Sequence, residues 1–231
     1  MRYEPLEERH VAIGVDLGQS RDPTTIAAVE RVRLVVPGYV ADELRDSEHG
    51  RRRLADLRKE LPKPTFNLRI LEQAPLGEAY PAQALRIHRV QANPNLQGQC
   101  VPVFVDYTGV GRAVFEIFRA ANIRHMTGVT LTFNGQEGPN GQGGHSVPKL
   151  ALVSRINALM HSGRLRMPPE LPLRSTFHRE LQDFRVSYTA AGNATFNALE
   201  GRHDDTLTAV GLALYGLSGE REASVEPLRI K

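Results

Sequence analysis

The sequence is poor in the features that most quickly define a protein's class. It has a single cysteine, Cys100, among 231 residues, which excludes an internal disulfide and a cysteine-rich zinc site. No apolar run approaches the roughly 20 residues that a membrane-spanning helix needs. The charged start of the chain, MRYEPLEERH, lacks the apolar core of a signal peptide. We therefore expect a protein of a reducing, cytoplasmic compartment that does not associate with a membrane.

Lysine is also scarce. Only four of the 29 basic residues are lysines and the rest are arginines, within a modest net charge of +3. Arginine binds phosphate oxygens through paired hydrogen bonds, so this bias suits a nucleic-acid partner. A GC-rich genome would give the same bias without any function. The composition is therefore compatible with nucleic-acid binding and does not by itself establish it.

The pattern of apolar residues predicts an α/β protein. Buried strands are expected in VAIGVDLG, from residue 11 to Asp16 with Gly18 opening a turn, and over 100–106 (CVPVFVD). Further strands are expected over 24–36, 67–73 and 128–133. Helical periodicity or capping signals predict helices over 79–91, 108–123, 147–163, 175–184 and 203–219, and a β-hairpin is expected from 185–189 and 195–199.

The order of these elements predicts the architecture. Strands come first in a cluster and then alternate with helices, which indicates a mixed β-sheet flanked by helices on its faces. No internal repeat or long flexible linker divides the chain. We therefore expect a single domain over 1–231, with a polar N-terminal segment 1–10 and a C-terminal tail 219–231.

Two segments fall outside this pattern. Residues 37–64 are dense in charge and have proline at both ends, which predicts an exposed, partly helical excursion. Residues 134–145 are rich in glycine and are expected to form a loop, either a mobile flap or an ordinary surface loop.

The acidic residues fall at informative places. Asp16 and Asp106 each end an apolar strand, and Asp204 and Asp205 begin the last helix. Taken singly, each has an ordinary explanation, because aspartate often starts a turn or caps a helix. In open α/β sheets, however, ligand sites gather beyond the carboxyl ends of the strands. Three acidic positions at the ends of elements therefore favour a site for a divalent metal ion.

Such a site would suit hydrolysis of a phosphodiester. Carboxylate oxygens are the ligands that Mg²⁺ and Mn²⁺ prefer. Two such ions about 3.5–4 Å apart activate a water molecule and stabilise the leaving oxygen. Clustered carboxylates also repel one another, so we expect the metal-free site to be strained.

Five segments together resemble a known family. GVDLGQSRDPTTIAAVE, VFVDYTGVG, SVPKLALVSRINALMHSGRLRMP, FHRELQDF and GRHDDTLTAVGLAL occur in the order found in the nuclease domain of large terminase subunits of tailed bacteriophages. The resemblance spans most of the chain, from about Ile13 to Leu214. It implies an RNase H-like fold and a metal-dependent endonuclease that cuts concatemeric phage DNA during packaging.

The resemblance also assigns the acids. It places Asp16 as the first-strand acid and Asp106 as the acid of the later strand. Asp205 is the preferred third acid, with Asp204 as the alternative, and His203 resembles a histidine found beside the third acid that would touch a metal or the scissile phosphate. One or two Mg²⁺ or Mn²⁺ ions are implied.

Three further residues are candidates for supporting roles. Asp22 would help to hold a metal-bound water, although an aspartate before proline is also a common turn former. Lys149 falls where the family carries a lysine, and it and Arg202 are candidates for binding DNA phosphates. Either would equally serve as a surface residue.

The resemblance covers only part of a large terminase. No G-x-x-x-x-G-K-[ST] phosphate-binding loop occurs in the sequence, so the ATPase domain is expected to be absent and the chain to be the C-terminal nuclease half. A naturally split gene is the alternative. The implied partners are double-stranded DNA, the ATPase domain of the full-length protein, the small terminase subunit and the portal protein, in the cytoplasm of the infected bacterium.

Three rival interpretations remain. A Holliday-junction resolvase or transposase shares the fold, but the resolvase pattern places an acid where this chain has Thr208. An actin-like or sugar-kinase ATPase also begins with DLG, but it needs a second such domain, for which 231 residues are few. A DNA-docking module without activity is the third, and the acids at all three positions argue against it.

Overall fold

A computed structural model describes residues 3–18, 22–96, 99–108, 111–141, 143–188, 194–197 and 203–218. Eight strands form one mixed sheet in the order β6-β7-β5-β4-β1-β2-β3-β8. In chain order they are β1 (Leu6–Asp16), β2 (Thr25–Val35), β3 (Thr65–Gln73), β4 (Val103–Asp106), β5 (Met126–Thr132), β6 (Gly138–Pro139), β7 (His145–Pro148) and β8 (Leu165–Arg166). Strands β1, β2 and β3 form an antiparallel meander, whereas β4, β5 and β7 run parallel to β1.

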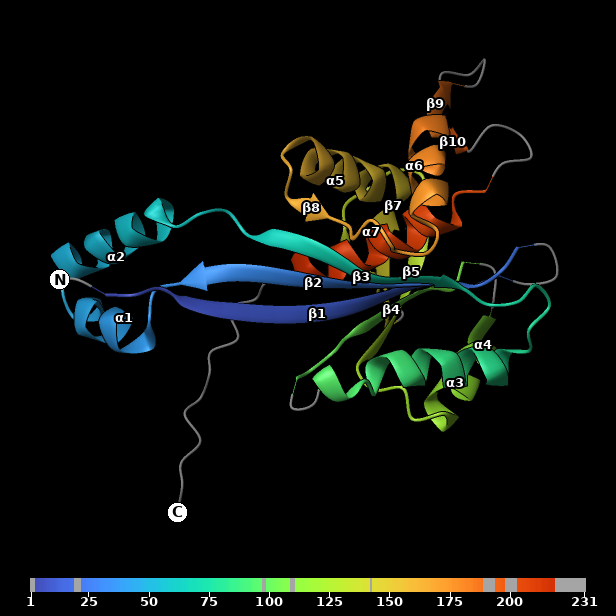
Figure 1. Ribbon diagram of the computed structural model, residues 1–231, viewed down its shortest axis with the longest axis horizontal. Coiled ribbons are helices and arrows are strands. Elements are labelled where there is room, and N and C mark those ends of the chain that lie inside the picture. Colours follow the sequence, from blue (N-terminus) through green and yellow to red (C-terminus); the bar gives the residue numbers. More distant parts are fainter. Residues whose placement is uncertain are drawn as a thin grey trace.

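Helices cover both faces of this sheet. The described α-helices of the chain are α1 (Gly38–Arg45), α2 (Glu48–Glu60), α3 (Tyr80–Gln91), α4 (Gly111–Ala120), α5 (Lys149–His161), α6 (Arg174–Asp183) and α7 (Asp205–Ser218). Helices α3 and α4 lie on one face, and α5, α6 and α7 lie on the other (Figure 1). The predicted α/β class, a mixed sheet flanked by helices on both faces, is confirmed.

Helix α7 is the centre of the second layer. It packs on β1, β2 and β4 beneath α5, and almost every one of its residues is buried. Its approach to the sheet is possible because Gly14 has no side chain, since a Cβ there would lie 2.0 Å from the carbonyl oxygen of Ala209. The glycine of the GVDLG segment therefore sets how closely the last helix approaches the first strand.

The first strand is longer than the sequence predicted. β1 begins at Leu6 rather than at residue 11, and it pairs with β2 along its whole length, from Leu6 opposite Val35 to Asp16 opposite Thr25. The outer part of this ribbon is held by polar contacts such as the 2.7 Å ion pair between Glu8 and Arg33. Because both of its faces are largely exposed, it carries charges where a buried strand carries apolar residues, and the apolar pattern missed it.

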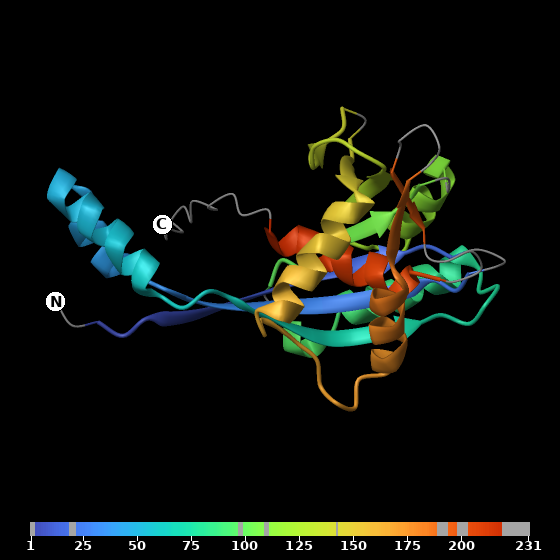
Figure 2. The same ribbon diagram turned by 90° about the horizontal axis from the view of Figure 1, so that it is seen from above.

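The two segments outside the apolar pattern both contain regular structure. Residues 37–64 form the helical pair α1 and α2, which lies beyond the end of the β1–β2 ribbon, away from the rest of the molecule (Figures 1 and 2). Residues 134–145 contain β6 and the start of β7, and Arg155 of α5 binds Glu137 of this segment through two hydrogen bonds of 2.7 and 2.9 Å.

The predicted hairpin is present as β9 (Arg185–Tyr188) and β10 (Ala194–Asn197). Within the described residues, no helix combines the length and the apolarity that a bilayer crossing requires.

Candidate metal centre

Two of the predicted acids lie side by side on the central strands. Strands β1 and β4 are parallel neighbours, and their last residues, Asp16 and Asp106, are directly paired. Paired residues of a sheet point to the same face, and Asp16 shares its face with Gly14, the residue beneath α7. The topology therefore brings two carboxylates, 90 residues apart in the sequence, to one edge of the sheet on the α7 side.

Helix α7 brings the third acid to the same edge. Asp205 is the first residue of this helix and is 9% exposed. The negative charge of Asp205 contributes to raising the pKa of Asp16, so the two carboxylates lie near each other. The Oδ2 atom of Asp205 is buried and accepts no hydrogen bond. An acceptor left without a donor in a buried place is costly, and a cation would satisfy it.

Glu180 of α6 fixes the position of Asp205. Its Oε2 atom accepts hydrogen bonds from the N–H of Thr206 (3.0 Å), the N–H of Leu207 (3.3 Å) and the hydroxyl of Thr206. The first N–H groups of a helix have no partner within the helix, so a carboxylate from another helix caps α7 here. Because the capped residues directly follow Asp205, this contact holds the third acid over the sheet edge.

The site is electrostatically unfavourable in the absence of a cation. Burial, and then the charges of Asp106 and Asp205, raise the pKa of Asp16 well above its usual range. Burial also raises the pKa of Asp106, although the N–H of Thr108 donates a 2.8 Å hydrogen bond to its Oδ1 atom. Burial raises the pKa of Asp205 to about 6 against the opposing effect of His203. Each of these carboxylates is thus held at a cost that a positive charge would relieve.

The donor atoms of these residues suit a hard divalent cation, but the side chains are not arranged around a single metal position. The donors are carboxylate oxygens, which suit Mg²⁺ or Mn²⁺. Within the part of the chain that the structure describes, no three Asp, Glu, His or Cys side chains are already grouped around a single point. Binding a metal would therefore draw the carboxylates of Asp16, Asp106 and Asp205 together.

The predicted neighbours of the acids are also at this edge. Lys149, the first residue of α5, forms a 2.7 Å ion pair with Asp204, so its ammonium group is engaged by an acid of the site. His203 lies 2.8 Å from Asp22 and 3.8 Å from Asp205. Arg202 lies outside the described residues. Asp204 thus has a cationic partner, whereas the Oδ2 atom of Asp205 has no hydrogen-bond partner.

Comparisons with known proteins show which solved structures share the fold of this chain. No protein-family model and no curated protein matches the sequence. The large terminase nuclease from thermophilic phage G20c matches over 90% of this chain and 82% of its own, with 20% identity and a TM-score of 0.53. The same nuclease with bound magnesium gives a TM-score of 0.57 over the same shares at 20% identity. The large terminase nuclease domain of Thermus phage P74-26 matches over 89% and 78% of the two chains, at 20% identity and a TM-score of 0.53.

The chain has the fold of a large terminase nuclease domain. This confirms the RNase H-like fold that the order of the sequence segments implied. At 20% identity the likeness concerns the fold, and the roles of individual residues have to be argued from their own geometry.

Two buried polar residues of this candidate site were missed by sequence reasoning. Thr25 is paired with Asp16 across β1 and β2, is fully buried, and has a hydroxyl without a partner. Glu180, the cap of α7, is 7% exposed. Nothing in the local sequence marks Thr25, but an acid between Phe177 and Leu181 on a short helix is a signal for a buried carboxylate, because those neighbours pack in the core.

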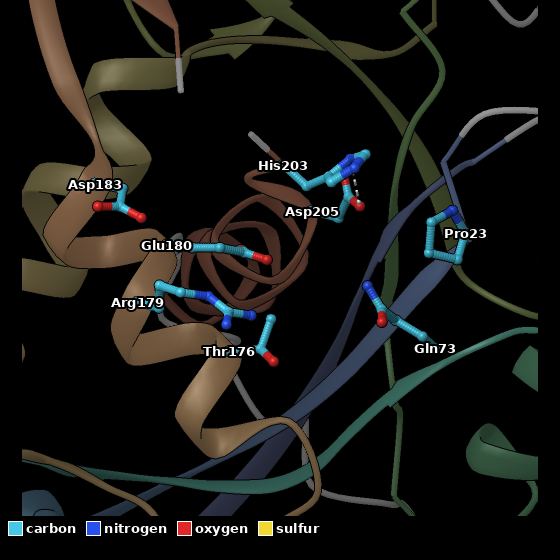
Figure 3. Close-up of a pocket in the computed structure, with 8 residues that line it drawn as sticks. All are labelled: Pro23, Gln73, Thr176, Arg179, Glu180, Asp183, His203 and Asp205. Atoms are coloured by element: carbon cyan, nitrogen blue, oxygen red, sulfur yellow. Dashed lines mark ion pairs between the residues drawn. The ribbon is translucent and has the colours of Figure 1, made fainter. Parts of the chain in front are cut away.

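A pocket of about 500 Å³ opens beside Asp205. Helix α6 forms one side of it and the end of β3 forms the other (Figure 3). It is lined by Pro23, Gln73, Thr176, Arg179, Glu180, Asp183, His203 and Asp205. The third acid therefore faces a space large enough for part of a ligand.

Proposed function

We propose that the chain is a metal-dependent endonuclease domain that hydrolyses double-stranded DNA with little sequence preference. The observation that carries this proposal is the direct pairing of Asp16 with Asp106 on parallel strands, at the same sheet edge as Asp205, whose buried Oδ2 atom accepts no hydrogen bond. The fold shared with large terminase nucleases supports the same function, as does the magnesium or cobalt bound in two structures of the G20c nuclease.

The carboxylates of Asp16, Asp106 and Asp205 would hold one or two Mg²⁺ or Mn²⁺ ions. When bound, such ions lower the pKa of water and neutralise charge on the phosphate. The chain's own residues supply the geometry: β1 and β4 fix two acids in register, and Glu180 fixes the third through the start of α7. Lys149 holds Asp204 in an ion pair and lowers part of the repulsion among the acids. His203, joined to Asp22, borders Asp205 and would meet either metal or phosphate.

The terminase-like fold supports a proposal for the biological setting. We propose that the domain cuts concatemeric phage DNA during packaging, in the cytoplasm of an infected bacterium. It would act as one domain over 1–231, joined in the full-length protein to an ATPase domain and working with a small terminase subunit and a portal protein. A resolvase is disfavoured because Thr208 stands where that pattern has an acid.

The test is cleavage of supercoiled plasmid by the purified chain in EDTA, Mg²⁺ or Mn²⁺. Asp106→Ala should abolish nicking, whereas Asp42→Ala, an exposed acid of α1 far from the sheet edge, should not. Nicking that persists in EDTA or in Asp106→Ala would remove the acids from the chemistry. DNA binding without any cleavage, in a protein that binds metal, would favour a docking module instead.

A further inference from the structure

The pocket beside Asp205 is lined mostly by polar side chains, both hydrogen-bond donors and carboxylates. Thr176, Arg179, Glu180 and Asp183 follow one face of α6, at positions three and four residues apart, and all line the pocket. Gln73 faces them from the end of β3 (Figure 3). Because Gln73 pairs with Thr25, and Thr25 pairs with Asp16, the pocket lies at the same edge of the sheet as the acids.

Arg179 is the charged group of this pocket best able to meet a ligand. Its side chain is exposed, and among the described residues it has no ion pair. Some other arginines are paired with carboxylates, such as Arg155 with Glu137 and Arg86 with Glu78. The guanidinium of Arg179 has no such carboxylate partner among the described residues, and its planar donors match a phosphate group.

Not all of the acidic residues that line the pocket would repel a bound anion. The carboxylate of Glu180 is engaged by three donors at the start of α7. The charge of Asp205 would be compensated by the metal of the proposed function. Asp183 is a further acidic residue of the lining, so we expect the pocket to bind a phosphate weakly unless the same strand is already held at the acids.

We propose that this pocket binds a backbone phosphate of the DNA strand, adjacent to the phosphodiester held at the acid centre. The guanidinium of Arg179 and the hydroxyl of Thr176 donate to the phosphate oxygens from α6, and the amide of Gln73 donates from β3. The strand thus leaves the acids along α6 rather than along α5. The inference rests on the proposed function, because it takes DNA as the ligand and the acids as the cleavage site.

Arg174 provides a matched control for Arg179. It lies on the same helix, is exposed and, among the described residues, makes no ion pair, but it does not line the pocket. The experiment measures binding of a fluorescent DNA duplex by anisotropy, with Ca²⁺ in place of Mg²⁺ to prevent cleavage, over a series of salt concentrations. The proteins are the unaltered chain, Arg179→Ala, Arg179→Lys and Arg174→Ala, each checked by thermal melting.

Arg179→Ala should weaken binding roughly tenfold and should lower the slope of log affinity against log salt by about one. Arg179→Lys should keep the slope and lose part of the affinity, because lysine keeps the charge without the paired donors. Arg174→Ala should change neither quantity. An unchanged affinity and slope in Arg179→Ala, or equal losses in Arg174→Ala, would overturn the phosphate site. The proposed function would still stand if the unaltered chain cuts plasmid. Failure of the unaltered chain both to bind the duplex and to cut plasmid would overturn the site and the proposed function together.

Discussion

At the scale of single residues, the acid centre formed by Asp16, Asp106 and Asp205 couples proton binding to folding. The pKa of Asp205 is raised to about 6, and burial raises those of Asp16 and Asp106 as well. In the unfolded chain these carboxyls titrate near their ordinary value of 3.8. Between these values the folded chain therefore binds more protons than the unfolded chain, so these groups lower stability as pH rises.

This coupling predicts an unusual pH profile for the metal-free protein. In EDTA, the melting temperature should rise as pH falls from about 7 to about 5, because the clustered carboxyls become protonated. Below about 4.5 it should fall again, since ion pairs hold the pKa values of Glu8, Glu30 and Glu78 below their ordinary value and these groups then lose their charge. Thermal melting at several pH values measures this. A melting temperature that falls steadily from pH 7 downward would contradict it.

The choice between the two neighbouring acids of α7 gives a second prediction. Asp204 forms a close ion pair with Lys149, whereas the Oδ2 atom of Asp205 has no hydrogen-bond partner. In EDTA at neutral pH, Asp205→Asn should melt a few degrees above the unaltered chain, because a repelled buried charge is removed; each kcal/mol corresponds to roughly 2–4 °C for a chain of this size. Added Mg²⁺ or Mn²⁺ should stabilise the unaltered chain and Asp204→Asn, and should leave Asp205→Asn unchanged. The opposite pattern in the two variants would make Asp204 the third ligand.

The sequence predicted the acids of the site better than their surroundings. Asp16, Asp106 and Asp205 stand at the ends of strongly apolar elements, and parallel topology then requires the strand ends to meet. Contacts such as Glu180 with Thr206 depend on how two helices pack. No local pattern contains that information.

At the scale of elements, the close packing of α7 on β1 is the most demanding feature of the fold. A Cβ at Gly14 would meet the carbonyl oxygen of Ala209 at 2.0 Å and the backbone nitrogen of Ala213 at 2.5 Å. Both atoms belong to the helix backbone and have no rotamer to change. Helix α7 would have to move away from the sheet, and Asp205 would move with it.

Gly14→Ala should therefore lower both stability and metal-dependent nicking. We expect a loss of roughly 1–3 kcal/mol, the usual cost of overpacking a core. Gly38→Ala is the control, because a Cβ there meets nothing within 4 Å and its backbone is not left-handed, so it should be neutral or slightly stabilising. Chemical denaturation of both variants gives the comparison. Equal stability in the two would show that α7 does not depend on this contact.

The elements that sequence patterns missed share a physical cause. The outer half of β1 and the short strands β6 and β8 are held by backbone pairing at the margin of the sheet, where few apolar side chains are buried. Periodicity reports burial rather than pairing. It therefore predicted α7, β4 and the inner half of β1, which are buried, and overlooked the outer half of β1 and the short strands β6 and β8, which bury few side chains.

At the scale of the whole molecule, the acid edge and the α1–α2 pair lie at opposite ends of the β1–β2 ribbon (Figures 1 and 2). The two helices pack chiefly against each other through Val40, Ala41, Leu54 and Leu57. Most of their described ion pairs, such as Arg52 with Glu48, are also internal. The pair therefore has its own small core and contributes little to the packing of the rest.

This separation predicts that the pair can be removed. Strands β2 and β3 are antiparallel neighbours and pair as far as Val32 opposite Thr65, so a two-residue Asn-Gly turn can join them in place of residues 33–64. The shortened chain should keep its metal-induced rise in melting temperature and its plasmid nicking to within about a factor of three, because the acid edge loses no contact. Loss of Arg33 removes the closer of the two described ion pairs of Glu8, which lies 2.7 Å from Arg33 and 3.6 Å from His10, so Glu8→Gln in the same background separates that small effect from any other. A collapse of the metal response in both shortened chains would show that the ribbon transmits strain from α1 and α2 to Asp16, and the distant helices would then belong to the site's support.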